Sequence, residues 1–318
     1  MSRRSSPVSP APAEAEALAR GVATRLSPLL RRLIADNPSP FTFTGTCSYA
    51  VGEGEVAVVD PGPADAAHLD RLLAMLAGER VSCIVVTHSH RDHAAGAAAL
   101  QRLTGAPIYG ARAYVPGRAG ASRADASHAL DYVPDVALAD GERIAGRGFT
   151  LEAIATPGHA ANHLCFAFIE QNALFSGDCV MAWSSSAIIP PDGAMADYAT
   201  SLMKLRRRRE AVYWPGHGGP VTDPQRRLAA LARHRRRREA AILDRLAAGE
   251  ADVDAIVAGV YAGLGPSLLG AAKLSTLAHL EDLVARGLAV ADGAPTLGAR
   301  FRRASSLTAP GSPPAPRR

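Results

Sequence analysis

Short apolar runs, each followed by a polar turn that contains glycine, recur through the first two thirds of the chain. The clearest of them, 81–86, is rich in β-branched residues and predicts a buried strand. Segments 149–155, 173–175 and 211–213 predict further strands. The Ala-rich segment 94–103 predicts a helix soon after the first run. Strands that alternate with helical segments are typical of an α/β fold.

The last third of the chain changes to helical periodicity. Pro224 is expected to open a long helix that ends near Gly249. Two further helical segments follow, with apolar positions at Val253, Ile256, Val257, Val260 and Tyr261, and then at Leu277, Leu280 and Val284. Two short strands, 288–290 and 296–302, complete a pattern that predicts a winged-helix-like unit.

These patterns divide the chain into four parts. Residues 1–24 and 304–318 are rich in Ser, Pro, Ala and Arg, and are expected to be disordered tails. Residues 25–223 would form the main α/β domain, and residues 224–303 the long helix with its winged-helix-like domain. A chain of 318 residues is long enough to bury both cores.

Composition predicts a soluble, cytoplasmic protein. Hydrophobic residues make up 47% of the chain, and no apolar stretch approaches the length needed to span a membrane, so no membrane partner is expected. The four cysteines are widely spaced and form no C-x-x-C pair, which predicts buried free thiols at Cys47, Cys83, Cys165 and Cys179. No sequence feature sets an oligomeric state.

The formal charge of +5 is weak support for a nucleic-acid partner. The surplus equals the arginines that follow the last acidic residue, Asp292, namely Arg300, Arg302, Arg303, Arg317 and Arg318. Two arginine runs inside the chain, 206–209 and 235–238, leave two interpretations open: a solvated helix face, or a track for a phosphate backbone.

The candidate chemistry is concentrated in residues 87–93, Thr-His-Ser-His-Arg-Asp-His. This run begins at the carboxyl end of the predicted strand 81–86, which is where open α/β layers position their sites. Side chains two residues apart in an extended chain point the same way, so His88 and His90 would face one metal ion. Asp92 and His93 stand at the start of the following helix and would face a second ion.

Three more candidate ligands lie in turns that contain glycine, each after a predicted strand: His159 in Thr-Pro-Gly-His, Asp178 in Ser-Gly-Asp and His217 in Pro-Gly-His-Gly. The whole set fits two zinc ions with three or four protein ligands each, one shared carboxylate, and coordination left open for water. Such a water loses its proton with a pKa of about 7, and the resulting hydroxide would attack carbon or phosphorus. The sequence therefore predicts a zinc-dependent hydrolase.

These motifs, with Val58-Val59-Asp60-Pro61-Gly62 upstream, resemble the metallo-β-lactamase superfamily in their order over about residues 29–220. The resemblance implies an α/β fold of the four-layer αββα sandwich type. It implies a first zinc held by His88, His90 and His159, a second held by Asp92, His93 and His217, and Asp178 as the bridging ligand. Asp60 would orient a ligand imidazole, because metal binding needs one histidine tautomer.

A narrower resemblance is to the beta-lactamase-like protein 2 group, whose best-known member is an endoribonuclease. The similar segments are 175–180, 191–202 around Pro191-Asp192-Gly193, and 234–239, together with a small carboxyl-terminal helical domain. The chain departs from this group at 45–49, Gly-Thr-Cys-Ser-Tyr, in one wall of the expected pocket.

Other polar residues receive supporting roles in this interpretation. Asp92 would also steer the hydroxide and pass a proton to the leaving group. The loop after Asp178 would form a wall of the substrate cleft, with Asp192 and Tyr198 as its polar residues, and His163 would line the pocket. The remaining histidines are expected to be surface or packing residues: His68, His128, His234 and His279.

Several substrates remain compatible with this ligand set. The narrower resemblance favours single-stranded RNA, cleaved at its phosphodiesters. A small-molecule ester or thioester, as in glyoxalase II-like enzymes, or a lactone is the close alternative. Iron-dependent sulfur dioxygenation and non-catalytic nucleic-acid binding are less favoured, the latter because all seven candidate ligands are present.

Overall fold

The computed structural model of the protein describes residues 18–115 and 127–304. The chain separates into two compact units, Met1–Arg235 and Arg236–Arg318. The predicted tails lie outside the described residues except for 18–24 and 304. Residues 18–24 are not a free tail, because Leu18 is buried and the Gly21 N–H donates to the Ile34 carbonyl at 2.8 Å.

The first sheet of the larger unit has seven strands in the order β1-β2-β3-β4-β5-β6-β7. Pairing is antiparallel from β1 to β4 and parallel from β4 to β7. The strands are β1 (Thr24–Ser27), β2 (Leu30–Ile34), β3 (Cys47–Glu53), β4 (Glu55–Val59), β5 (Arg80–Val86), β6 (Ile108–Gly110) and β7 (Val136–Ala137).

The second sheet has five strands in the order β12-β11-β10-β9-β8. All its pairs are antiparallel except β11 with β12, which is parallel. Its strands are β8 (Arg143–Gly146), β9 (Phe149–Ala155), β10 (Leu164–Phe168), β11 (Ala173–Gly177) and β12 (Val212–Pro215), and the short helix η1 (Ile169–Gln171) joins β10 to β11. The predicted strands 81–86, 149–155, 173–175 and 211–213 correspond to β5, β9, β11 and β12.

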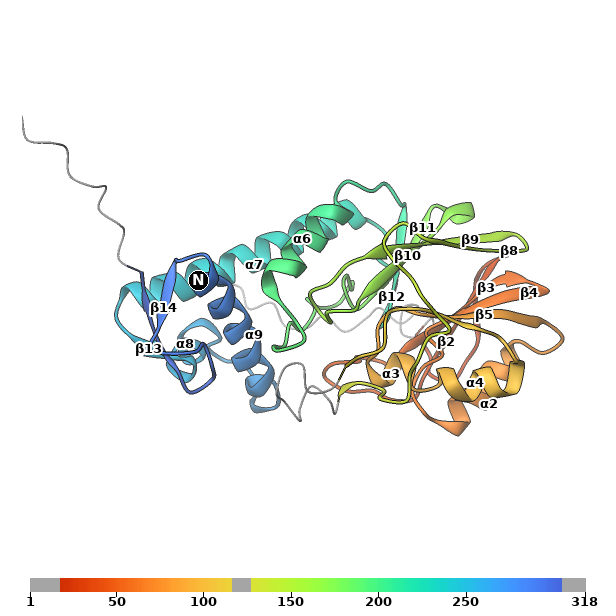
Figure 1. Ribbon diagram of the computed structural model, residues 1–318, viewed down its shortest axis with the longest axis horizontal. Helices are drawn as coiled ribbons and strands as arrows, with labels where there is room; N and C mark the ends of the chain where they lie inside the picture. The colour runs from red at the N-terminus through yellow and green to blue at the C-terminus, as the bar shows by residue number, and fades with distance from the viewer. Residues whose placement is uncertain (1–17, 116–126, 305–318) are drawn as a thin grey trace, which may run out of the picture. The chain divides into compact units, whose positions relative to one another are not determined.

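The two sheets pack face to face with helices on their outer faces (Figure 1). Alternate residues of a strand point to opposite faces, so Ala57 and Val59 join the core between the sheets, while Val56 and Val58 pack toward the helices. Helices α2 (Ala66–Met75) and α4 (Ala97–Thr104) cover the first sheet, and α6 (Met195–Leu205) lies beside the second. The predicted αββα arrangement is confirmed.

The predicted helix 94–103 is interrupted. Helix α3 (Arg91–Ala94) ends before Gly96, and α4 begins after it. A Cβ at Gly96 would lie 2.9 Å from the Pro61 carbonyl oxygen, so the chain passes tightly against the turn that follows β4. This contact brings the first helical turn after β5 against the turn that carries Asp60.

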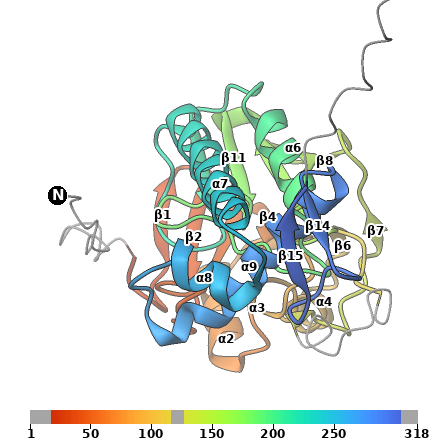
Figure 2. The same cartoon turned by 90° about the vertical axis from the view of Figure 1, so that its left-hand side faces the viewer.

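The smaller unit combines helices with a three-stranded sheet of order β13-β15-β14. Its elements are the second part of α7 (Pro224–Ala247), then β13 (Ala251–Asp252), α8 (Val253–Val260), α9 (Pro266–Ala285), β14 (Ala289–Ala291) and β15 (Arg300–Arg303). Figure 2 shows β14 beside β15. The last strand begins later than predicted, at Arg300, and Phe301 enters a core shared with Ile256 and Leu280. This order of elements is the predicted winged-helix pattern.

All four cysteines are buried and free, as predicted. Within the described residues, no helix combines the length and apolar character that a membrane span requires.

Candidate metal centre

The seven predicted ligands lie at the carboxyl ends of strands from both sheets. The run 87–93 follows β5 and enters α3, His159 follows β9, Asp178 follows β11 and His217 follows β12. Because these strand ends meet at one edge of the sandwich, residues separated by more than one hundred positions become neighbours. The structure brings together all seven side chains. Among the described residues, they make up three of the groups that could hold a metal ion.

Three imidazole nitrogens form the first group. The Nδ1 atom of His90 lies 3.0 Å from Nε2 of His88 and 3.0 Å from Nε2 of His159. Ligands placed 2.0–2.1 Å from a tetrahedral zinc ion would be about 3.3 Å apart. The three nitrogens therefore converge at nearly the spacing that one ion requires.

The second group contains a carboxylate and two imidazoles. The Nε2 atom of His93 lies 3.3 Å from Nε2 of His217 and 3.3 Å from Oδ2 of Asp92, and the third side of this triangle, from His217 to Asp92, is 3.4 Å. These spacings also match one tetrahedral ion.

Asp178 lies between the two groups. Its Oδ2 atom is 3.5 Å from Nε2 of His159 and 3.3 Å from Nε2 of His217, so one oxygen faces a ligand of each group. Its Oδ1 atom is buried and has no hydrogen-bond partner among the described residues. An orphaned buried carboxylate oxygen is costly unless a cation balances it, and this position is the one expected of a shared ligand.

Hydrogen bonds on the far side of the rings determine which nitrogen carries a proton. The Nδ1 atom of His159 lies 2.6 Å from the Ala187 carbonyl, which can only accept, so Nε2 has a bare lone pair. Thr87 donates its hydroxyl proton to Asp60, so it must accept from Nδ1 of His88, and Nε2 of His88 is bare as well. Two bare lone pairs are thus directed at Nδ1 of His90, an arrangement that a cation among the three nitrogens would satisfy.

Asp60 holds the second group in the same way. Its Oδ2 atom accepts from Nδ1 of His93 at 2.9 Å, and its Oδ1 atom accepts the backbone N–H of Thr87 at 2.8 Å. The Nε2 atom of His93 is thereby directed at the centre. Asp60 occupies the position that its predicted orienting role requires.

The electrostatics of the two groups differ. Burial, followed by the neighbouring rings, lowers the pKa of His88 well below its usual value, and burial and His159 lower the pKa of His90 to about 3. Burial alone would also lower the pKa of His93, but the carboxylates of Asp92 and Asp178 raise it well above its usual value. Burial and neighbouring rings therefore favour the neutral form of His88 and His90, whereas the carboxylates around His93 favour a positive charge there.

The three predicted cleft residues lie in different environments. Asp192 is partly exposed, and its Oδ1 atom accepts the Ala161 N–H at 3.2 Å. His163 is buried behind the centre, where its Nε2 atom accepts the Asp178 N–H at 3.1 Å. Tyr198 was predicted to line the cleft, but it does not. It is fully buried because it lies on the inner face of α6, and its hydroxyl donates to the Cys179 carbonyl at 3.1 Å.

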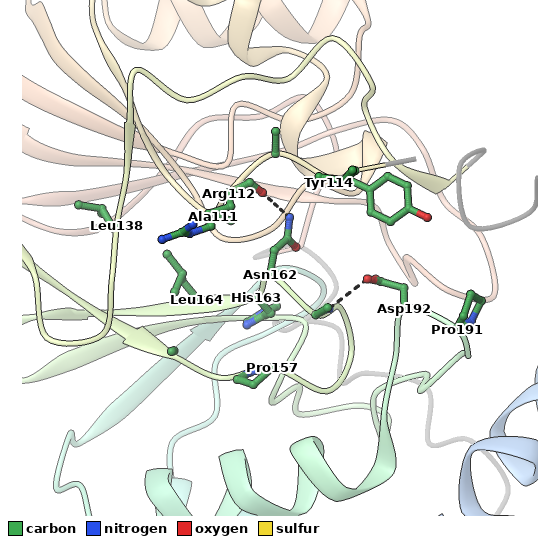
Figure 3. A pocket seen from close by; sticks show the side chains of 14 residues that line it. Ala111, Arg112, Tyr114, Leu138, Pro157, Asn162, His163, Leu164, Pro191 and Asp192 are labelled. Carbon is green, nitrogen blue, oxygen red and sulfur yellow. Dashed lines mark hydrogen bonds between the residues drawn. The ribbon is translucent and has the colours of Figure 1, made fainter. Parts of the chain in front are cut away.

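A pocket of about 700 Å³ lies beside the centre. It is walled mainly by apolar residues such as Leu138, Pro157 and Leu164. In Figure 3, Arg112 and Tyr114 lie along its upper side, with Asn162, His163 and Asp192 beneath them. Through His163 and Asp192, the pocket shares a wall with the centre.

Sequence reasoning missed two contacts of the site. Thr46 donates its hydroxyl to Oδ2 of Asp92 at 2.9 Å. His128, expected to be a surface or packing residue, is buried with its Nε2 atom 3.4 Å from Oδ2 of Asp192. Segment 45–49 was expected only as part of the pocket wall, and no motif surrounds His128. The isolated bridges Thr46–His217 and His90–His128, which pair distant backbone segments, bring both residues to the site.

The arginine runs are partly used inside the fold. Arg208 pairs with Glu152 and Glu210 at 3.0 and 2.6 Å. Arg235 donates to the Ser186 carbonyl, and its guanidinium lies 5.2 Å from the centre of the Tyr198 ring. These two side chains serve the larger unit and are not available as a continuous phosphate track.

Comparison with known families identifies both units. The family model described as the metallo-beta-lactamase superfamily matches residues 41–217, and the model of the beta-lactamase associated winged helix domain matches residues 253–298.

Two curated relatives are similar over much of the chain. The atrochrysone carboxyl ACP thioesterase of Aspergillus fumigatus is 30% identical over 225 residues, covering 69% of this chain and 65% of that protein. The beta-lactamase-like protein 2 homolog of Caenorhabditis elegans is 31% identical over 230 residues, covering 69% of this chain and 71% of that protein. The chain thus spans about two thirds of the length of these relatives.

Solved structures show the same architecture. A metallo-beta-lactamase family protein from Thermus thermophilus superposes with a TM-score of 0.73 at 25% identity, covering 88% of this chain and 100% of that chain. A beta-lactamase domain protein from Burkholderia ambifaria has a TM-score of 0.74 at 23% identity, with coverages of 90% and 94%.

Proposed function

Because this chain belongs to the metallo-β-lactamase superfamily and is a metal-dependent hydrolase of that fold, we propose that it uses two zinc ions to hydrolyse an acyl thioester. The similarity to the beta-lactamase-like protein 2 homolog and the winged-helix domain support the predicted branch.

The observation that carries the proposal is a pair of groups of three donor atoms each. Within each group neighbouring atoms lie 3.0–3.4 Å apart, and Asp178 lies between the two groups. His88, His90 and His159 would hold one ion, and Asp92, His93 and His217 the other. Two such ions, when bound, supply Lewis acidity and a water that ionises near neutral pH. Imidazole and carboxylate ligands suit zinc but also iron, so metal analysis separates this proposal from sulfur dioxygenation.

Asp92 is the proposed proton carrier. Its side chain is 29% exposed, more than the side chains of His93 or His217, which are 0% and 2% exposed. Its Oδ2 atom is engaged by Thr46 and faces the histidines, which leaves Oδ1 to take a proton and pass it to the leaving group.

An acyl thioester is favoured over RNA by the surroundings of the centre. The adjoining pocket of about 700 Å³ is mainly apolar, as an acyl group requires. Two arginines of the runs that might have tracked phosphates are engaged internally. The thioesterase of Aspergillus fumigatus has 30% identity with this chain. This ordering reverses the preference that the sequence alone suggests.

RNA phosphodiester cleavage is the second candidate. It rests on the 31% identity with the beta-lactamase-like protein 2 homolog, the branch whose resemblance first suggested an endoribonuclease. We further propose a reducing, cytoplasmic location, which the four free cysteines support.

The test is hydrolysis by zinc-loaded protein of a panel of acyl thioesters, lactones and single-stranded RNA, with metal content measured on the same sample. Two zinc ions per chain and thioester turnover that His90→Ala abolishes are expected. RNA cleavage without thioester turnover would establish the second candidate instead, and one iron per chain would contradict the zinc proposal.

A further inference from the structure

The carboxylate of Asp192 lies beside the first metal group without being one of its predicted ligands. Its Oδ2 atom is 3.4 Å from Nε2 of His128 and 3.9 Å from Nε2 of His90. This oxygen and Nε2 of His128 are buried and have no hydrogen-bond partner among the described residues. Figure 3 shows Asp192 at the rim of the pocket.

The proton on His90 follows from the geometry of the first group. Its Nδ1 atom faces the bare nitrogens of His88 and His159 at 3.0 Å, so it must itself be bare when a cation lies between them. A neutral imidazole has one N–H, which then resides on Nε2. That N–H faces Asp192.

The proton on His128 follows from its other neighbour. Ser89 Oγ accepts the side-chain N–H of Asn162 at 2.7 Å, and it lies 2.7 Å from Nδ1 of His128. The hydroxyl has a single proton to donate, and giving it to Nδ1 leaves the ring proton of His128 on Nε2, whereas the other tautomer would set a bare nitrogen 3.4 Å from the carboxylate oxygen of Asp192. Two N–H groups therefore converge on one orphaned carboxylate oxygen.

These protons argue against a third cation at this place. Nitrogen atoms of His90 and His128 and an oxygen of Asp192 lie within 4.8 Å of one another, close enough for one ion. However, both nitrogens would have to lose their protons, and His90 would have to bind two ions at once. A carboxylate that faces two ring N–H groups and acts on them electrostatically fits these atoms better.

His128 and Asp192 are both held firmly. The ring of His128 stacks on Tyr114 with centroids 3.7 Å apart and planes 1° from parallel. Its backbone pairs with that of His90 in an isolated bridge, and the Ala129 N–H donates to the Ser89 carbonyl at 2.8 Å. The Ala161 N–H binds Asp192 to the turn that carries His159.

We propose that Asp192, supported by His128, is a positioning residue that keeps the proton of His90 on Nε2 and so presents its bare Nδ1 to the first metal ion. This inference rests on the proposed metal centre. A carboxylate behind a ligand histidine fixes the tautomer and raises the basicity of the ligand, and its removal commonly weakens metal binding 10–100-fold.

The experiment is titration of the metal-free protein with Zn²⁺ against a chromophoric chelator, followed by the visible spectrum of the Co²⁺-loaded protein. Asp192→Asn removes the charge and keeps the shape. One of the two ions should bind about 10–100-fold more weakly, and the cobalt absorption of that site should change. The matched control is Asp197→Asn, which removes an exposed carboxylate on α6 and should leave both readouts unchanged.

A second variant, His128→Phe, keeps a ring to stack on Tyr114 but removes both nitrogens. It should weaken the binding of the same ion. Unchanged affinity and spectrum in Asp192→Asn would overturn the inference while leaving the two-metal proposal intact. A third bound ion that Asp192→Asn abolishes would overturn it in favour of a cation site. A wild-type chain that binds fewer than two ions would instead contradict the proposed function itself.

Discussion

The Nδ1 atom of His93 lies 2.9 Å from Oδ2 of Asp60, and the two side chains are 0% and 3% exposed. Because both side chains are buried, the carboxylate holds the imidazole in a single tautomer and orientation. The contact joins the turn after β4 to the helix after β5, two segments whose strands are neighbours in the sheet.

Replacing this carboxylate should weaken the second metal site selectively. In Asp60→Asn, a neutral amide faces His93 and Thr87. It has one acceptor oxygen in place of two and no negative charge. We expect about 10–100-fold weaker binding of one zinc ion, with turnover recovered at high zinc concentration. Chelator competition measures the affinity, and equal affinities in variant and wild type would contradict the role assigned to Asp60.

A methyl group at Gly216 should disturb the centre without any change of ligand. A Cβ there would lie 2.5 Å from Oδ1 of Asp178 and 2.6 Å from Cε1 of His93. Gly216→Ala should therefore displace both side chains and reduce zinc content to below two ions per chain. Gly219→Ala is the matched control, because nothing lies within 4 Å of a Cβ at that position. Full zinc content in both variants would show that the centre tolerates the displacement.

His90→Ala should abolish turnover and leave the fold intact. The variant removes one nitrogen of the first group, while the ring is 18% exposed and lies outside the two main cores. Circular dichroism and thermal unfolding in the metal-free state should match wild type. Arg91→Ala, which changes the exposed neighbour, should retain both metal ions. Undiminished turnover in His90→Ala would remove the catalytic claim.

Glu79 provides a pH-dependent contribution to stability away from the centre. It pairs with Arg31 at 2.5 Å and accepts the Gly54 N–H at 2.8 Å. Burial alone would raise its pKa, but Arg31 and Gly54 lower it below the usual 4.5. A carboxylate whose pKa is lowered on folding stabilises the fold at pH values above its pKa in the unfolded chain. This stabilisation is lost as the pH falls through its pKa in the folded protein.

Glu79→Gln should therefore lower the free energy of unfolding by about 1 kcal/mol at pH 7, and the difference should shrink as the pH falls below 4.5. Urea unfolding of the metal-free protein at several pH values measures both. Glu53→Gln, an exposed acid of the same sheet, should show neither effect. A difference for Glu79→Gln that persists at pH 3 would rule out the ion pair as its source.

Much of the candidate site could be predicted from the sequence because its signal is local. Each ligand stands in a turn directly after an apolar run, and a strand followed by a turn is encoded by residues next to one another. The spacing within 87–93 similarly depends only on the geometry of a strand end that enters a helix. All seven predicted ligands therefore lie in turns that the sequence encodes locally, and the meeting of these strand ends at one edge of the sandwich brings them together.

Other features depended on which distant segments meet. Helix 94–103 is broken because Gly96 packs against the turn after β4. Tyr198 is buried because α6 turns that face inward. His128 reaches Asp192 and His90 only through the packing of three separate segments.

The sequence by itself thus determined the α/β fold class, the ligand types and the order of the strands that deliver them, since these follow from periodicity and turn chemistry. Only the tertiary structure decided which side chains support those ligands and which arginines are engaged internally. The physical reason is that such contacts arise from long-range packing, in which burial and hydrogen-bond partners come from segments far apart along the chain.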